Sequence, residues 1–128
     1  MNYELLFICL NMKDSIIKDK SFDFAVRIVG LFKYLKDKNE FVLSKQILRS
    51  GTSIGAYVRE ALNAESKPDF IHKLSIAQKE CDETLYWIEL LFKSEIISKN
   101  EFDSINNKCT EILKIIKSII ITSKTHNS

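Results

Sequence analysis

The sequence has very few residues that make turns. Its 128 residues include three glycines and one proline. A β-sandwich or β-barrel needs many tight turns, so this scarcity argues against an all-β fold. The chain also lacks a run of about 18 apolar residues, which a membrane-spanning helix requires, and its opening, MNYELLFICLN, lacks the basic region and cleavage pattern of a signal peptide. We therefore expect an all-α protein of the cytoplasm with no membrane partner.

Cysteine and histidine are too sparse for most chemical sites. The cysteines Cys9, Cys81 and Cys109 are odd in number and widely spaced, and His72 and His126 are isolated. A disulfide framework or a zinc site needs closer pairs, and a di-metal bundle site needs a Glu-x-x-His motif. The sequence thus predicts no metal, no cofactor, no small-molecule substrate and no enzymatic activity. A pairing of one cysteine with His72, as nucleophile and base, stays open as the alternative.

Charge is unevenly distributed along the chain. The net charge is +2, with −1 from Glu4, +4 over residues 12–64, −3 over residues 65–98 and +2 over residues 99–128. So small a net charge does not indicate nucleic acid by itself. The basic first half and the acidic middle can complement each other within a chain or between copies. Ordinary solvated helix faces of mixed sign are the other interpretation.

Hydrophobic periodicity predicts four helices. We place them at about Ser21–Lys36, Leu43–Asn63, Ser66–Ser94 and from Ser98 onward. An earlier turn from Lys13 can extend the first. Ser66 is a good N-cap, and the fourth helix opens with the capping box Ser-Lys-Asn-Glu.

Short connections make neighbouring helices antiparallel, so residues 13–122 are predicted to form an up-down-up-down four-helix bundle. Residues 1–12 are an N-terminal arm of uncertain status, since Met12 offers a second translation start, and residues 123–128 are a polar tail that should fray. The runner-up is a three-helix core with the first helix docked separately.

Small residues interrupt the second predicted helix. Gly51 and Gly55 are four residues apart and share one face. A helix retains glycines there when another backbone approaches closely. A phosphate-binding glycine-rich loop is the weaker alternative, because no strand precedes the run and its spacing is not that of a Walker sequence.

The second and third helices should form a hairpin folded near Glu65, which places Arg49 opposite Glu80 and Glu83. Arginine can bind carboxylates through two nitrogens. We predict a structural ion pair that fixes the register of the two helices, with a ligand or RNA contact as the alternative.

The chain carries more apolar surface than one bundle needs. The first helix has two apolar stripes, the segment Ile112–Ile121 is rich in isoleucine, and Tyr57 and Trp87 fall off the core stripes. Surplus apolar surface usually marks an interface, and large aromatics often dominate its energy. We predict a closed homo-oligomer with Tyr57 and Trp87 at its interface. Alternatively, the first helix and the arm cover the surplus within one chain.

One long stretch resembles a known family. The run LSKQILRSGTSIGAYVREALNAESKPDFIHKLSIAQKECDETLYWIELL, with the upstream KSFDFAVRIVGLFKYL, is similar to the four-helix-bundle proteins encoded in intervening sequences of bacterial 23S ribosomal RNA genes. The small-residue run occurs there together with Glu80, Glu83 and Trp87. Tyr57 departs from the family, which commonly has Asn at that position, so a polar contact made by that Asn is in doubt here.

The resemblance implies a helical bundle that assembles as a ring-like homopentamer without enzymatic activity. A related branch, the accessory variability protein of diversity-generating retroelements, works with a reverse transcriptase and nucleic acid. For this chain the resemblance and the basic first half favour RNA or a ribonucleoprotein as partner. The competing class is an interaction scaffold or accessory subunit for another enzyme, such as a reverse transcriptase. The expected phosphate contacts are Lys33, Lys36, Lys38 and Lys45, with Arg59 as a further candidate.

Overall fold

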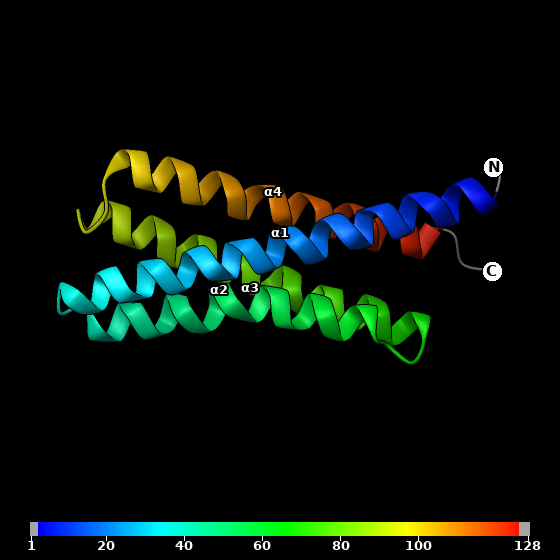
Figure 1. Cartoon of the computed structure of the whole chain (residues 1–128), viewed down its shortest axis with the longest axis horizontal. Coiled ribbons are helices and arrows are strands. Elements are labelled where there is room, and N and C mark those ends of the chain that lie inside the picture. Colours follow the sequence, from blue (N-terminus) through cyan, green and yellow to red (C-terminus); the bar gives the residue numbers. More distant parts are fainter. Residues whose placement is uncertain (1–2, 126–128) are drawn as a thin grey trace.

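Residues 3–125 form four antiparallel α-helices (Figure 1). The structure is a computed structural model that describes the backbone of residues 3–125 and the side chains of residues 12–125. The helices are α1 (Tyr3–Asp37), α2 (Phe41–Leu62), α3 (Lys67–Lys93) and α4 (Lys99–Thr125). No strand occurs within residues 3–125. The prediction of an all-α four-helix bundle is confirmed.

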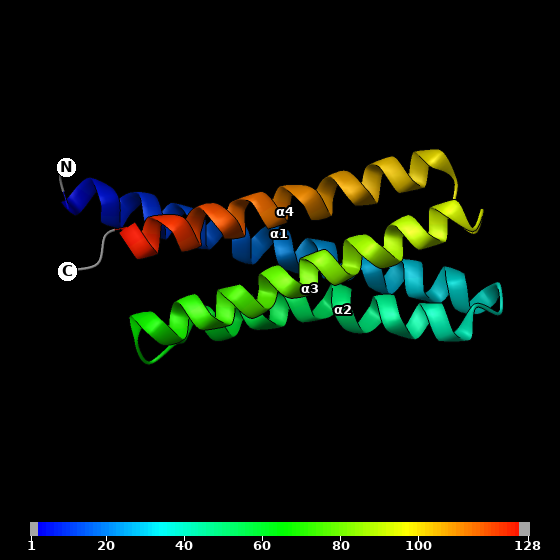
Figure 2. The same cartoon turned by 180° about the vertical axis from the view of Figure 1, so that it is seen from behind.

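Consecutive helices pack side by side, whereas the first and last helices, α1 and α4, pack together less tightly. The pairs α1–α2, α2–α3 and α3–α4 make extensive contacts, whereas α1 and α4 contact each other much less. Figures 1 and 2 show α1 and α4 crossing near the end of the bundle where α1 begins and α4 ends, and separating toward the other end. Because α1 contacts α2 as extensively as α2 contacts α3, α1 is an integral part of the bundle, and the three-helix alternative is wrong.

Two helix boundaries differ from those predicted. α1 begins at Tyr3, well before Ser21, because no glycine or proline interrupts the segment and Ile17 continues the buried stripe upstream. α4 continues through Thr125, with Ser123 buried, so residues 123–125 are helical rather than frayed. The rest of the predicted tail, residues 126–128, lies outside the described residues. The predicted arm, residues 1–12, also falls almost wholly where side chains are not described.

The connections are short and held by the expected caps. Ser66 Oγ accepts a hydrogen bond from the Asp69 backbone N–H at 3.2 Å, and Ser98 Oγ does the same for Glu101 at 3.2 Å. These bonds satisfy amide groups that a helix start leaves free. Between α1 and α2, Asn39 has a φ of 63°, in the left-handed region that asparagine tolerates better than most residues.

The core runs along the whole bundle axis and is almost entirely aliphatic. Each helix contributes fully buried side chains at helical spacing, which is the pattern that predicted the fold. These are chiefly Ile17, Phe24, Ile28, Leu35, Ile47, Ile54, Val58, Leu74, Ala77, Cys81, Ile88, Cys109, Ile116 and Ile119.

The two glycines of α2 allow α1 to approach closely. A Cβ atom added at Gly51 would lie 2.7 Å from Ile28 Cγ1, and one added at Gly55 would lie 3.2 Å from the backbone oxygen of Ser21. The first distance is shorter than real Cβ atoms allow, and the second is tighter than most Cβ contacts in proteins. The expectation that another backbone approaches this face is therefore confirmed, and the approaching helix is α1.

Candidate functional site

The polar residues of the α2–α3 hairpin lie where the register predicted them. Arg49 Nη1 donates to Glu80 Oε2 at 3.2 Å, and Arg49 Nη2 donates to Glu83. The hydrogen bond to Glu83, together with the charge of Glu80, raises the pKa of Arg49 above its ordinary value. The Arg49 side chain is nevertheless 51% exposed, so water screens the pair.

A second polar contact lies beneath this ion pair, and the sequence analysis missed it. Thr84 Oγ1 donates to Ser50 Oγ at 2.9 Å and lies 2.7 Å from the carbonyl oxygen of Glu80, and both hydroxyl side chains are fully buried. The sequence could have revealed this contact, because Ser50 and Thr84 occupy core positions in the apolar pattern of their helices. A buried hydroxyl pair of this kind favours one register of α2 against α3, because a shift would break the hydrogen bond between the two helices.

The predicted phosphate-binding residues fall into two groups. Lys33, Lys36, Lys38 and Lys45 are all exposed and lie where α1 ends and α2 begins; we call them the lysine cluster. Arg59 lies near the opposite end of α2, with its guanidinium 5.3 Å from the ring centroid of Phe22. Within the described side chains, none of the five forms a salt bridge with a carboxylate.

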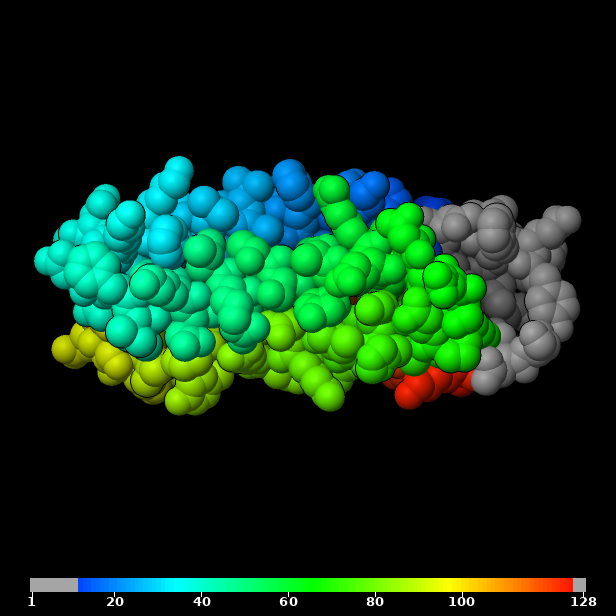
Figure 3. All heavy atoms as spheres, turned by 90° about the horizontal axis from the view of Figure 1, so that it is seen from below, coloured from blue at the N-terminus to red at the C-terminus, as the bar shows by residue number. Residues whose placement is uncertain are grey.

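An exposed apolar stripe runs along α1. Phe22, Val26 and Val29, here called the α1 stripe, are 52%, 57% and 37% exposed. Beside it a groove of about 200 Å³ lies between α1 and α2, with Ala25, Gly55 and Ala56 in its lining. Figure 3 shows α1 and α2 side by side on this side of the molecule.

Tyr57 and Trp87 pack against the core of their own chain. Both are partly buried. The Trp87 ring meets the ring of Tyr86 edge-on at 5.0 Å, and Tyr86 is itself exposed. The Trp87 indole nitrogen is buried and has no hydrogen-bond partner among the described residues. Their role at an oligomer interface stays a prediction.

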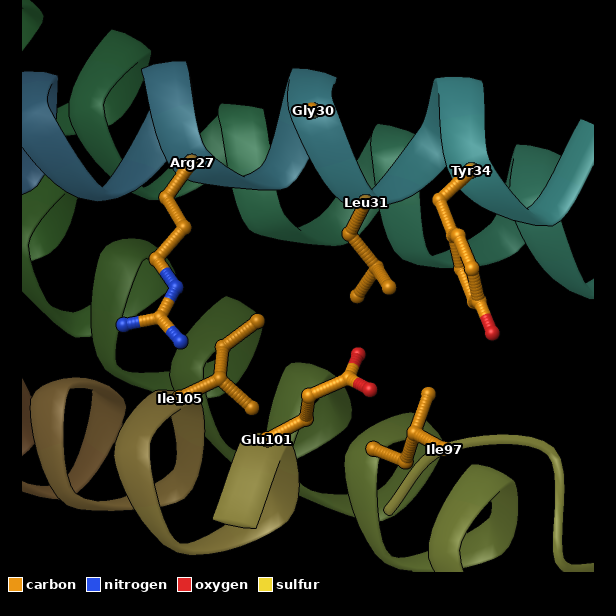
Figure 4. Close-up of a pocket in the computed structure, with 7 residues that line it drawn as sticks. All are labelled: Arg27, Gly30, Leu31, Tyr34, Ile97, Glu101 and Ile105. Atoms are coloured by element: carbon orange, nitrogen blue, oxygen red, sulfur yellow. The ribbon is translucent and has the colours of Figure 1, made fainter.

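Where α1 and α4 separate, they leave a cavity of about 390 Å³ (Figure 4). Ile97 and Ile105 are nearly buried and give it an aliphatic floor. α1 adds Leu31 and the half-exposed ring of Tyr34, and Gly30 leaves open space because no atom lies within 4 Å of where its Cβ would be.

Two charged side chains enter this cavity from opposite helices (Figure 4). Arg27 of α1 donates from Nη1 to Ser104 Oγ at 2.7 Å, which holds the guanidinium between the helices. Glu101 of α4 accepts a hydrogen bond from Ser98 Oγ at 3.2 Å through Oε1. The sequence analysis did not single out either residue, because the cavity arises from how far α1 and α4 diverge.

The described residues offer little for metal or thiol chemistry. Among them, no group of three His, Cys, Asp or Glu side chains could hold a metal ion. Cys81 and Cys109 are fully buried, and hydrogen bonding to Cys109 and burial raise the pKa of the Cys81 thiol, which keeps it protonated. His72 is exposed, so the structure does not bring it into the core with these thiols. No helix within residues 3–125 is long and apolar enough to cross a membrane.

Comparison with known proteins identifies a family and a solved structure to which the chain is similar. The family model described as 23S rRNA-intervening sequence protein matches residues 13–118. A crystal structure of a protein with unknown function from the S23 ribosomal protein family of Bacteroides thetaiotaomicron VPI-5482 is 59% identical, with a TM-score of 0.83. The match covers 84% of this chain and 97% of that one. No curated protein matches the chain. Neither matching description names a catalytic activity.

Proposed function

Because the chain belongs to the 23S rRNA-intervening sequence protein family, we propose that it is a non-enzymatic helical bundle that assembles into a closed homo-oligomer and binds RNA. The observation that carries RNA binding is the lysine cluster. Its four ammonium groups are exposed at one end of the bundle, and none is paired with a carboxylate within the described side chains. Exposed lysines without carboxylate partners are suited to phosphates, whose binding releases condensed counterions.

The α1 stripe supports self-association. Three large apolar side chains lie exposed on one face of α1, beside a groove lined by small residues. A second copy that covers this face would remove the apolar stripe from water, which favours assembly by roughly 25 cal/mol for each Å² buried. We propose this face as the contact between copies. The copy number of five, and the ring shape, rest on the family resemblance.

RNA binding is tested by fluorescence anisotropy with a labelled single-stranded RNA at increasing salt. We expect binding at low salt that weakens steeply as salt rises, with a logarithmic slope of about 0.7 for each phosphate contacted. Replacing all four residues of the lysine cluster by glutamine should weaken binding and flatten that slope.

The matched control replaces four other exposed lysines, Lys79, Lys114, Lys117 and Lys124, by glutamine. It changes the net charge equally but leaves the lysine cluster intact. Absence of binding at low salt, or equal loss in the two variants, would contradict the proposed RNA surface.

A scaffold for another protein is the second candidate. The exposed ring of Tyr86, which meets the Trp87 ring edge-on, favours it, because large aromatic side chains often anchor protein interfaces. Recovery of partners from host extract with and without nuclease separates the two functions. A partner that persists after nuclease treatment and is lost in Tyr86→Ala would favour the scaffold.

A further inference from the structure

The cavity between α1 and α4 presents a cation and an anion across an apolar slot. Its volume of about 390 Å³ lies within the range of roughly 300–1,000 Å³ that small-ligand sites occupy. Arg27 and Glu101 enter from opposite helices, and the slot between them is lined by Leu31, Tyr34 and isoleucine side chains (Figure 4). A fitting ligand therefore has apolar faces and carries hydrogen-bond acceptors on one edge and donors on another.

Guanine has this arrangement of groups. Its O6 and N7 atoms accept hydrogen bonds, and the guanidinium of arginine is the commonest partner for that edge. Its N1–H and N2 amino group donate side by side, which suits the two oxygens of a carboxylate. The ring faces can pack against aromatic and aliphatic side chains, as unstacked RNA bases do in protein sites.

The other bases fit this pair of charges less well. Adenine presents an acceptor at N1 beside its N6 amino group, and cytosine presents an acceptor at N3 beside its N4 amino group. A carboxylate facing either edge would gain one hydrogen bond and meet one lone pair. Uracil offers a single N–H between two carbonyl oxygens, so it too gives Glu101 only one donor.

We propose that this cavity binds a guanine base, with Glu101 accepting from the N1–H and N2 amino groups and Arg27 donating to O6 and N7. Two sources carry this base, single-stranded RNA and a free guanine nucleotide, and the RNA source rests on the function proposed above. Lys38 supports the RNA source. It belongs to the lysine cluster, and its Nζ lies 5.7 Å from the centroid of the Tyr34 ring at the cavity lining, within reach of the phosphate of a bound nucleotide.

The first experiment titrates the full chain with guanosine, adenosine and inosine 5′-monophosphates by calorimetry. Guanosine monophosphate should bind at least about fivefold more tightly than adenosine monophosphate, because a good bidentate pair discriminates by roughly 1–3 kcal/mol. Inosine, which lacks the N2 amino group, should bind with intermediate affinity. No binding up to millimolar nucleotide, or equal binding of the guanine and adenine forms, overturns the proposal.

The variant that tests the carboxylate is Glu101→Gln. Glutamine also serves at this position of a capping box, so the start of α4 is preserved, but its amide cannot accept from both guanine donors. The guanine preference should disappear. Glu89→Gln is the matched control, since it removes one exposed carboxylate from α3 outside the cavity, and it should bind like the wild type. Unchanged guanine preference in Glu101→Gln overturns the assignment.

The second arm uses a short oligouridine that contains one guanine, compared with the same oligomer containing adenine. A guanine preference that Glu101→Gln abolishes in both arms supports RNA as the source. If the mononucleotide binds but no RNA does at low salt, the guanine site stands with a free nucleotide as its ligand, and the proposed RNA function fails. If RNA binds through the lysine cluster but ignores guanine and Glu101, the guanine proposal fails and the RNA function stands.

Discussion

Arg49 lies between two carboxylates at the surface of the α2–α3 hairpin. Its exposure determines how much the ion pair contributes to the free energy of unfolding. The side chain is 51% exposed, and exposed pairs contribute about 0.2–1 kcal/mol. We expect Arg49→Ala to lower the free energy of unfolding by no more than about 1 kcal/mol in chemical denaturation. Arg49→Lys, which keeps the charge, should lose less. A loss of several kcal/mol would mean that the pair is far more desolvated than its exposure indicates.

Gly51 and Gly30 form a matched pair of helical glycines with opposite surroundings. Alanine at Gly51 would place its Cβ 2.7 Å from Ile28 Cγ1, in the middle of a buried side chain, and such overpacking costs roughly 1–3 kcal/mol. Alanine at Gly30 meets nothing within 4 Å and gains helix propensity of up to about 1 kcal/mol. Urea unfolding should therefore show Gly51→Ala less stable and Gly30→Ala more stable than the wild type. A stabilised Gly51→Ala would contradict the close approach of α1.

Asp14 gives the chain a pH-dependent penalty. Burial raises the pKa of this carboxyl above 3.8, and its Oδ1 has no hydrogen-bond partner among the described residues. A raised carboxyl pKa means that the native state binds the proton more tightly than the unfolded state. The ionisation of Asp14 thus costs no stability well below pH 3.8; the cost grows as pH rises from 3.8 to the folded pKa and is constant above it. Asp14→Asn should be more stable than wild type in melts at pH 7, with the difference vanishing near pH 3. An equal difference at both pH values would exclude ionisation as the cause.

For single residues, the sequence predicted which side chains contact each other better than it predicted how exposed they are. The pairing of Arg49 with Glu80 and Glu83 follows from the hairpin register alone. The exposed fraction of the Arg49 side chain depends on how α2 and α3 pack around it, which no local sequence pattern encodes. The glycine spacing likewise indicated a close approach, but α1 and α3 both flank α2, and only the packed bundle shows that α1 is the partner.

α1 extends farther and exposes more apolar surface than the other helices. Its upstream half was hard to predict because the residues between Ile17 and Phe24 are polar except for the exposed Phe22, so the buried apolar period is weak there although the helix continues. On its outer side, the α1 stripe stays exposed although the Arg59 guanidinium lies over the Phe22 ring. The surplus apolar surface inferred from the sequence thus lies here, whereas Tyr57 and Trp87 pack against the core.

Val26→Glu tests whether the α1 stripe joins copies. Val26 is 57% exposed, so the substitution should leave the fold intact while placing a charge in the proposed contact, where burying it without a partner is costly. Light scattering in line with size-exclusion chromatography should show an oligomer for the wild type and a mass near the 14.8 kDa chain for the variant.

Val42→Glu is the control, because Val42 is 73% exposed on α2 and lies outside the stripe. It should remain oligomeric. A wild type that elutes as a monomer at tens of micromolar would refute the oligomer itself, and an oligomeric Val26→Glu would move the contact to another face.

For the molecule as a whole, the four-helix topology could be predicted from periodicity, caps and short connections, because each is a local property of the chain. The cavity between α1 and α4 could not be predicted. These two helices are far apart in sequence, and their separation depends on how three successive helix crossings accumulate along the bundle. Arg27 and Glu101 therefore look like ordinary surface residues until the bundle brings them to one slot (Figure 4).

Assembly and RNA binding should be coupled through the repetition of the lysine cluster. A closed oligomer carries one cluster on each copy, so an RNA long enough to reach several copies binds them at a high effective concentration, while a short oligomer contacts only one. Val26→Glu, as a monomer, should therefore lose at least about a hundredfold in affinity for long RNA and almost none for a short oligomer. Anisotropy with both lengths, at the same salt, measures this difference. A monomeric variant that still binds long RNA as tightly as the wild type would show that a single copy supplies the whole binding surface, and would contradict multivalent capture of RNA by the proposed oligomer.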